Sequence, residues 1–154
     1  MRYMVLMYAD PAQTKAMSAS DNDAVRRKHE ALCTELTESG ELLNGAGLAF
    51  PADTRTIRLQ DGIAVTTDGP FAEAEEHLTA YYLIDCDGPD RAHSIAERIL
   101  DFHVTAVEVR QVHDSVGIAD VDQPPVNTTG QRTGAGPARR SLTALIVPAC
   151  LTTM

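Results

Sequence analysis

The stretch from Thr66 to Asp85, TTDGPFAEAEEHLTAYYLID, restricts the possible folds more than any other part of the sequence. A β-forming run, Ile63 to Thr67, stops at Asp68-Gly69-Pro70, and an apolar strand, Ala80 to Ile84, follows a short acidic segment. Asp-Gly is a turn dipeptide because glycine tolerates positive φ, and the proline fixes φ directly after it. We therefore expect a sharp corner, with Phe71 pinning it against the core. The corner is either a wall of a concave site or simply a well-made turn.

Hydrophobic periodicity predicts a strand and a long helix before this stretch. Arg2 to Tyr8 is almost continuously apolar, which is typical of a central strand covered on both faces. Ser18 to Ser20 offer hydroxyl caps for a helix that runs through Ser39 and is closed by Gly40. The residues of its inward face recur at intervals of four, three and four: Val25, His29, Leu32 and Leu36.

A hairpin and a second helix complete the pattern. Thr54 to Leu59 and Ile63 to Thr67 flank Asp61-Gly62, which predicts a tight two-residue turn. Pro89 suits the first turn of a helix whose buried face would be formed by Ala92, Ile95, Ala96 and Ile99. The remaining predicted strands are Glu41 to Leu48, between the first helix and the hairpin, and Val104 to Val112, at the end.

The predicted order is β-α-β, a hairpin and then β-α-β, which we expect to form a sandwich of the β-α-β-β-β-α-β type. Helical crossovers between strands predict an α+β, ferredoxin-like sandwich with both helices on one face of a largely antiparallel sheet. The opposite face of the sheet is then apolar and uncovered. Chains of this size usually bury such a face against a second copy, so we expect a homodimer.

Composition narrows the class of protein. The 154 residues suit one domain, and acidic residues outnumber basic ones 22 to 13, giving a formal charge of −9. This charge argues against nucleic acid and against an anionic membrane surface as partners. The three cysteines have no CxxC spacing and fit a reduced, cytoplasmic compartment, and the apolar N-terminus is expected to be a strand and not a signal peptide.

We place the domain at residues 1–114 and a tail at residues 115–154. From Ser115 the sequence becomes rich in Pro, Gly, Thr and Gln without periodicity, which indicates a disordered or loosely attached segment. Its end, Ser141 to Leu151, is apolar again but too short to cross a bilayer. This run could add a strand to the sheet, cover the dimer groove or form an exposed end.

Sequence motifs give few chemical candidates. There is no phosphate-binding loop, no GxGxxG, no HExxH and no GxSxG, and the five histidines lack metal-site spacing, so we expect neither a cofactor nor a metal. His29 lies on the inward stripe of the first helix, with Cys33 one turn further on the same side. Its imidazole is either a core histidine or the general acid–base group of a pocket.

Three segments carry a family resemblance: MRYMVLMYAD, TDGPFAEAEEHLTAYYLID and VTAVEVRQV. They resemble the DGPF branch of the YCII-related (YciI-like) family over about Met1 to His113. The resemblance implies a dimeric α+β barrel, in which ferredoxin-like protomers pair sheet to sheet with a cleft in each. It also implies an acid–base pair, for which His29 matches the family's helix histidine and Asp101 is the nearest match to its aspartate.

Two hypotheses about function follow, and a third ranks below them. The first is a cofactor-independent lyase or isomerase acting on a small organic substrate, with His29 as general base and Asp101 or Asp68 orienting it. The second is a non-catalytic dimeric ligand-binding or regulatory module, since genes of such proteins often adjoin those of extracytoplasmic-function sigma factors. The third, a haem- or metal-binding relative of the same barrel superfamily, would need His29 as ligand.

Overall fold

The computed structural model describes residues 1–72 and 74–113. Its elements are β1 (Arg2–Ala9), α1 (Pro11–Ala16), α2 (Ala19–Glu38), β2 (Leu42–Gly47), β3 (Arg55–Gln60), β4 (Ile63–Asp68), β5 (His77–Asp85), α3 (Pro89–Ile99) and β6 (Ala106–Gln111). Two short 3-10 turns, η1 (Pro51–Asp53) and η2 (Leu100–Phe102), lie between them. Each predicted helix and strand is present within a few residues, and the predicted tail, 115–154, lies outside the described residues.

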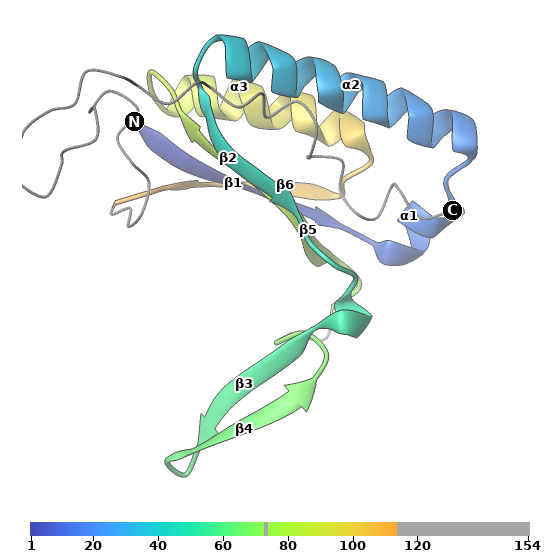
Figure 1. Ribbon diagram of the computed structural model, residues 1–154, viewed down its shortest axis with the longest axis vertical. Coiled ribbons are helices and arrows are strands. Elements are labelled where there is room, and N and C mark those ends of the chain that lie inside the picture. The colour runs from blue at the N-terminus through green and yellow to red at the C-terminus, as the bar shows by residue number, and fades with distance from the viewer. Residues whose placement is uncertain (73, 114–154) are drawn as a thin grey trace, which may run out of the picture.

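Four strands form one antiparallel sheet in the order β2-β5-β1-β6. The first strand is central, as predicted, because β1 pairs with β5 on one side and with β6 on the other. Only alternate side chains of β1 are buried, so within the protomer the strand is covered on one face and not on both. Helices α2 and α3 lie over the same face of the sheet (Figure 1). The chain therefore has the predicted α+β, ferredoxin-like fold.

Alternating side chains of the sheet and the apolar stripes of the helices form the core. On β1 the side chains of Tyr3, Val5 and Met7 are buried and those between them are not. They pack with the buried stripes of the two helices, among them Leu32, Leu36, Ala92, Ile95 and Ile99. Fully burying one large aliphatic side chain stabilises a fold by about 1.5–3 kcal/mol, so this layer holds the helices on the sheet.

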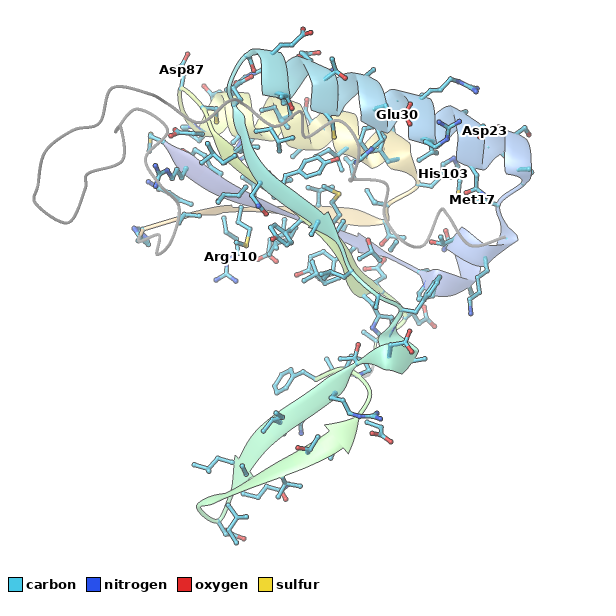
Figure 2. The ribbon with its side chains drawn as sticks, viewed as in Figure 1. Met17, Asp23, Glu30, Asp87, His103 and Arg110 are labelled. Carbon is cyan, nitrogen blue, oxygen red and sulfur yellow. The ribbon has the colours of Figure 1, made fainter. Side chains whose placement is uncertain are left out.

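The sheet face away from the helices is open in the protomer. It carries half-buried side chains of β1, including Leu6 and Tyr8, and Arg110 of β6 points to this side in Figure 2. Its polar groups are largely paired, because Tyr8 donates a hydrogen bond to Glu108 at 3.1 Å and Tyr81 donates one to Asn44 at 2.9 Å. The middle of this face is thus apolar, and the polar side chains at its edges hydrogen-bond to one another.

Helix α1 is an element that the sequence did not predict, since Asp10-Pro11 was expected only to end the first strand. The Asp10 side chain accepts a hydrogen bond from the Ala12 backbone N–H at 2.8 Å, and Pro11 occupies the first helical position. An aspartate cap followed by proline is a helix-start signal. The helix was missed because it is only six residues long and buries no residue.

Strands β3 and β4 form a separate two-stranded sheet, here called the arm, which stands away from the rest of the fold (Figure 1). The predicted Asp61-Gly62 turn is confirmed, with φ of 49° and 80° at these two residues. Positive φ at both central positions defines the turn type that matches the twist of a hairpin.

The expectation that Phe71 packs against the core is wrong. Its side chain is 74% exposed, and its ring lies 4.7 Å below the guanidinium of Arg58. Arg58 also donates a hydrogen bond to the Phe71 carbonyl at 2.7 Å. The corner belongs to the base of the arm, which leaves the body, so a side chain at this corner meets the arm instead of the core.

Candidate functional site: a buried histidine and an adjoining hollow

His29 lies on the face of α2 that is turned towards the sheet, as its periodicity predicted, and is only 4% exposed. Two aromatic rings enclose it. The Tyr82 ring of β5 is 5.8 Å from the imidazole, and the Phe102 ring of η2 is 5.7 Å away in an edge-on arrangement. His29 is therefore held in one place by elements from three different parts of the chain.

The imidazole begins a short chain of polar groups within the core. His29 Nε2 lies 3.6 Å from Cys33 Sγ, which in turn lies 3.4 Å from the Tyr82 hydroxyl. The other ring nitrogen, Nδ1, is buried and has no hydrogen-bond partner among the described residues. Leaving such a group unsatisfied costs about 1–3 kcal/mol, so a hydrogen bond to this nitrogen would be stabilising.

Burial keeps all three groups uncharged near neutral pH. Desolvation lowers the pKa of His29, and the nearby charge of Glu30 opposes this only in part. Desolvation raises the pKa of the Cys33 thiol and that of the Tyr82 hydroxyl. The cluster is thus a neutral imidazole beside a thiol, and not the imidazolium–thiolate pair of a cysteine nucleophile.

The two predicted carboxylates are exposed and engaged elsewhere. Asp101 lies in η2 with its side chain 72% exposed, and its carboxylate is 3.9 Å from the ammonium group of Lys28. Asp68 lies on the arm, 83% exposed, and forms an ion pair with Arg55. Neither makes a hydrogen bond to His29 in the described structure. Pairing of the imidazole with a carboxylate therefore stays a prediction.

A hollow of about 360 Å³ opens between the α1–α2 junction and the connection from η2 to β6. Its lining side chains are Gln13, Met17, Leu100, His103, Val104 and Thr105. Met17 and His103 lie close together near the start of α2 in Figure 2. Phe102 links the two features, because its ring contacts His29 while its chain neighbours line the hollow.

The sequence did not predict this hollow, because its lining comes from two connections far apart in the chain. The local signal is the residue pattern LDFHV, in which a histidine separates apolar residues just before the last strand. His103 adopts a left-handed conformation with φ of 57°. That conformation is uncommon outside glycine and often marks a functional loop.

Within residues 1–72 and 74–113, no three His, Cys, Asp or Glu side chains gather closely enough to bind a metal ion. In the same part of the chain, no helix combines the length and the apolar character that crossing a bilayer requires.

Comparison with known proteins agrees with the fold. The family model of the YCII-related domain, which describes the sequences of that family, matches residues 1–115. The chain is also 38% identical over 92 residues to a protein of Rhizobium meliloti (strain 1021) described as uncharacterized protein R00369. The aligned part covers 60% of this chain and 74% of that protein. On this match and its ferredoxin-like fold, the chain belongs to the YCII-related domain family.

Proposed function

We propose that the protein is a homodimeric, cytoplasmic module that binds a small organic molecule in the hollow beside His29. One observation carries the proposal. The buried Nδ1 of His29 has no hydrogen-bond partner in the described structure, and the Phe102 ring that contacts this imidazole belongs to a segment that lines a hollow. The open apolar sheet face supports a homodimer. The free thiols of Cys33 and Cys86 support a reduced, cytoplasmic compartment.

The lining indicates the chemistry of the ligand. Met17, Leu100 and Val104 supply apolar surface, whereas Gln13 and His103 supply hydrogen-bonding groups. A hollow of about 360 Å³ lies at the small end of the range for ligand sites. Because the exposed surface of the lining is more polar than apolar, the ligand that fits is a compact molecule without formal charge that carries polar groups over much of its surface.

A second candidate function is acid–base catalysis by a lyase or isomerase. Burial favours the neutral form of His29, which can accept a proton, and Asp101 precedes the Phe102 that covers it. The ion pair between Asp101 and Lys28 spans 3.9 Å and is exposed to solvent. Such surface ion pairs contribute only about 0–1 kcal/mol to stability. Breaking this ion pair therefore costs little, and the main cost of bringing Asp101 to the buried imidazole would be the desolvation of its carboxylate.

Binding can be tested by NMR of the imidazole nitrogens, with phenol, catechol and γ-valerolactone as probes. We expect at least one probe to shift the His29 resonances and to leave those of His93, exposed on α3, unchanged. A matched pair of variants is His29→Gln, which should lose the binding, and His93→Gln, which should keep it. Probes that bind without perturbing His29, or that bind His29→Gln as tightly as the native protein, would contradict the proposal.

The same samples separate binding from turnover. If a bound probe is converted by the native protein and Asp101→Asn binds it without converting it, acid–base catalysis is the function. If no bound probe is converted, the binding module stands.

A further inference from the structure

The arm has large apolar side chains that are mostly exposed in the described structure. Four large side chains on it and at its base, Ile57, Leu59, Ile63 and Phe71, are between 68% and 76% exposed. In the strand pairing Ile57 faces Thr66 and Leu59 faces Ala64, so Ile57, Leu59, Ala64 and Thr66 share one side of the arm, whereas Ile63 lies on the other side with Arg58. We call the first of these sides the arm face.

The two sides of the arm differ in charge. On the opposite side, Arg58 stacks over Phe71 and places a cation there. Between its ends the arm face has no charged side chain, and at its base Arg55 and Asp68 neutralise each other in an ion pair. The arm face is therefore the side suited to burial against another protein surface, because burying it strands no charge.

The arm is also poorly supported where it stands. Strands β3 and β4 hydrogen-bond only to each other among the described elements, and none of their residues is buried. An isolated two-stranded hairpin is marginally stable in water, and free strand edges with apolar side chains favour association. Something that packs on the arm face would stabilise the hairpin.

The area of the open sheet face indicates what that partner is. Four strands spaced about 4.8 Å apart and about 23 Å long present roughly 450 Å². A stable interface buries roughly 800 Å² of each partner. The flat footprint of the four strands is smaller than this area, and the arm, which extends from β2 and β5 of the same sheet, offers further apolar surface to the same partner (Figure 1).

We propose that the arm face, Ile57, Leu59, Ala64 and Thr66, packs against a second copy of this chain and is an essential part of the dimer interface. The inference rests on the proposed homodimer and adds to it the segment that holds the two copies together. In a two-fold dimer each arm contact occurs twice, so one substitution removes two contacts.

The test compares the dimer dissociation constants of three full-length variants by sedimentation velocity over a dilution series. Leu59→Asp and Ile57→Asp place a charge on the arm face, and Gln60→Asp places the same charge on the opposite side, one residue from Leu59. We expect the first two to raise the constant by at least about 100-fold, because burial of two copies of the side chain is lost. The Gln60→Asp variant should change it by less than about 3-fold.

Hydrogen exchange of the native protein gives a second measurement that needs no substitution. The amides of Ile57 to Thr66 should exchange slowly in the dimer and rapidly after dilution to the monomer. Fast exchange at both concentrations would overturn the inference. Slow exchange at both would overturn it as well, because another part of the same chain would then cover the arm.

The outcomes separate this inference from the proposed function. If Leu59→Asp and Ile57→Asp remain dimers with an unchanged constant, the homodimer stands and the role of the arm is refuted. If the native protein is a monomer at every concentration, both the homodimer and the arm contact are refuted.

Discussion

Replacing His29 with leucine should stabilise the protein, although the residue is almost completely buried. The substitution removes an unsatisfied Nδ1, worth about 1–3 kcal/mol, and keeps an apolar side chain of similar size on the inward stripe. It also removes the imidazole's contacts with Tyr82 and Phe102, worth about 0.5–1.5 kcal/mol. We expect a net gain of about 1 kcal/mol in the free energy of unfolding at pH 8.

The gain should grow at lower pH. The folded state holds the pKa of His29 below its ordinary value of 6.5, so the unfolded chain binds a proton that the folded protein does not. The contribution of neutral His29 to stability is therefore complete above pH 6.5 and is lost as the pH falls below it. The native protein should therefore lose stability between pH 6.5 and 5, and the leucine variant is free of this loss.

Urea unfolding followed by circular dichroism at pH 8 and pH 5 measures both effects. His93→Leu, an exposed position on α3, is the control and should change stability by less than about 0.5 kcal/mol at pH 8. The reasoning is refuted if His29→Leu is destabilised by more than about 1 kcal/mol at both pH values. The imidazole would then be a well-satisfied structural group.

Three further predictions concern the rest of the fold. Gly45→Ala should destabilise by about 1–3 kcal/mol in urea, because the new Cβ would lie 2.7 Å from the Tyr82 ring; an unchanged midpoint would contradict this close approach. Arg91→Gln should cost about 1 kcal/mol at pH 7, measured in the same way. The hydrogen bonds from Arg91 lower the pKa of Glu41 in the folded state. The loss of stability in Arg91→Gln should therefore fade as the pH drops below 4.5 and the carboxylate becomes protonated in both the folded and the unfolded state. A loss of stability that grew towards low pH would contradict this prediction. Gly62→Ala, with φ of 80° in the native turn, should speed hydrogen exchange in the arm and leave β1 amides unchanged; slower arm exchange would argue against this turn type.

The parts of the fold that depend on local pattern were predictable from the sequence. The interval of four, three and four residues placed His29 on the inward face of α2, and Asp61-Gly62 fixed the turn of the hairpin. The direction of that hairpin was not predictable, because whether two strands join the main sheet depends on pairing with residues far away. For this reason Phe71 was expected in the core and is exposed instead.

In the candidate site, too, the residues on one helix were predictable from the sequence and those from other elements were not. Cys33 was expected on the side of His29, because a spacing of four residues is local to one helix. Tyr82 comes from β5 and Phe102 from η2, and no sequence period relates either of them to α2. The position of Asp101 likewise depends on how η2 turns, which presents its carboxylate to Lys28 at the surface.

The place of β1 at the centre of the sheet affects how the chain folds as it is synthesised. This strand is made before either of its neighbours, yet Arg2 pairs opposite Asp85 and Tyr3 opposite Gln111. Pairings between such distant residues form slowly, because a long loop must close before any contact is gained. The apolar first strand is therefore without its partners while the rest of the chain is synthesised, which exposes it to aggregation and makes it a binding site for chaperones.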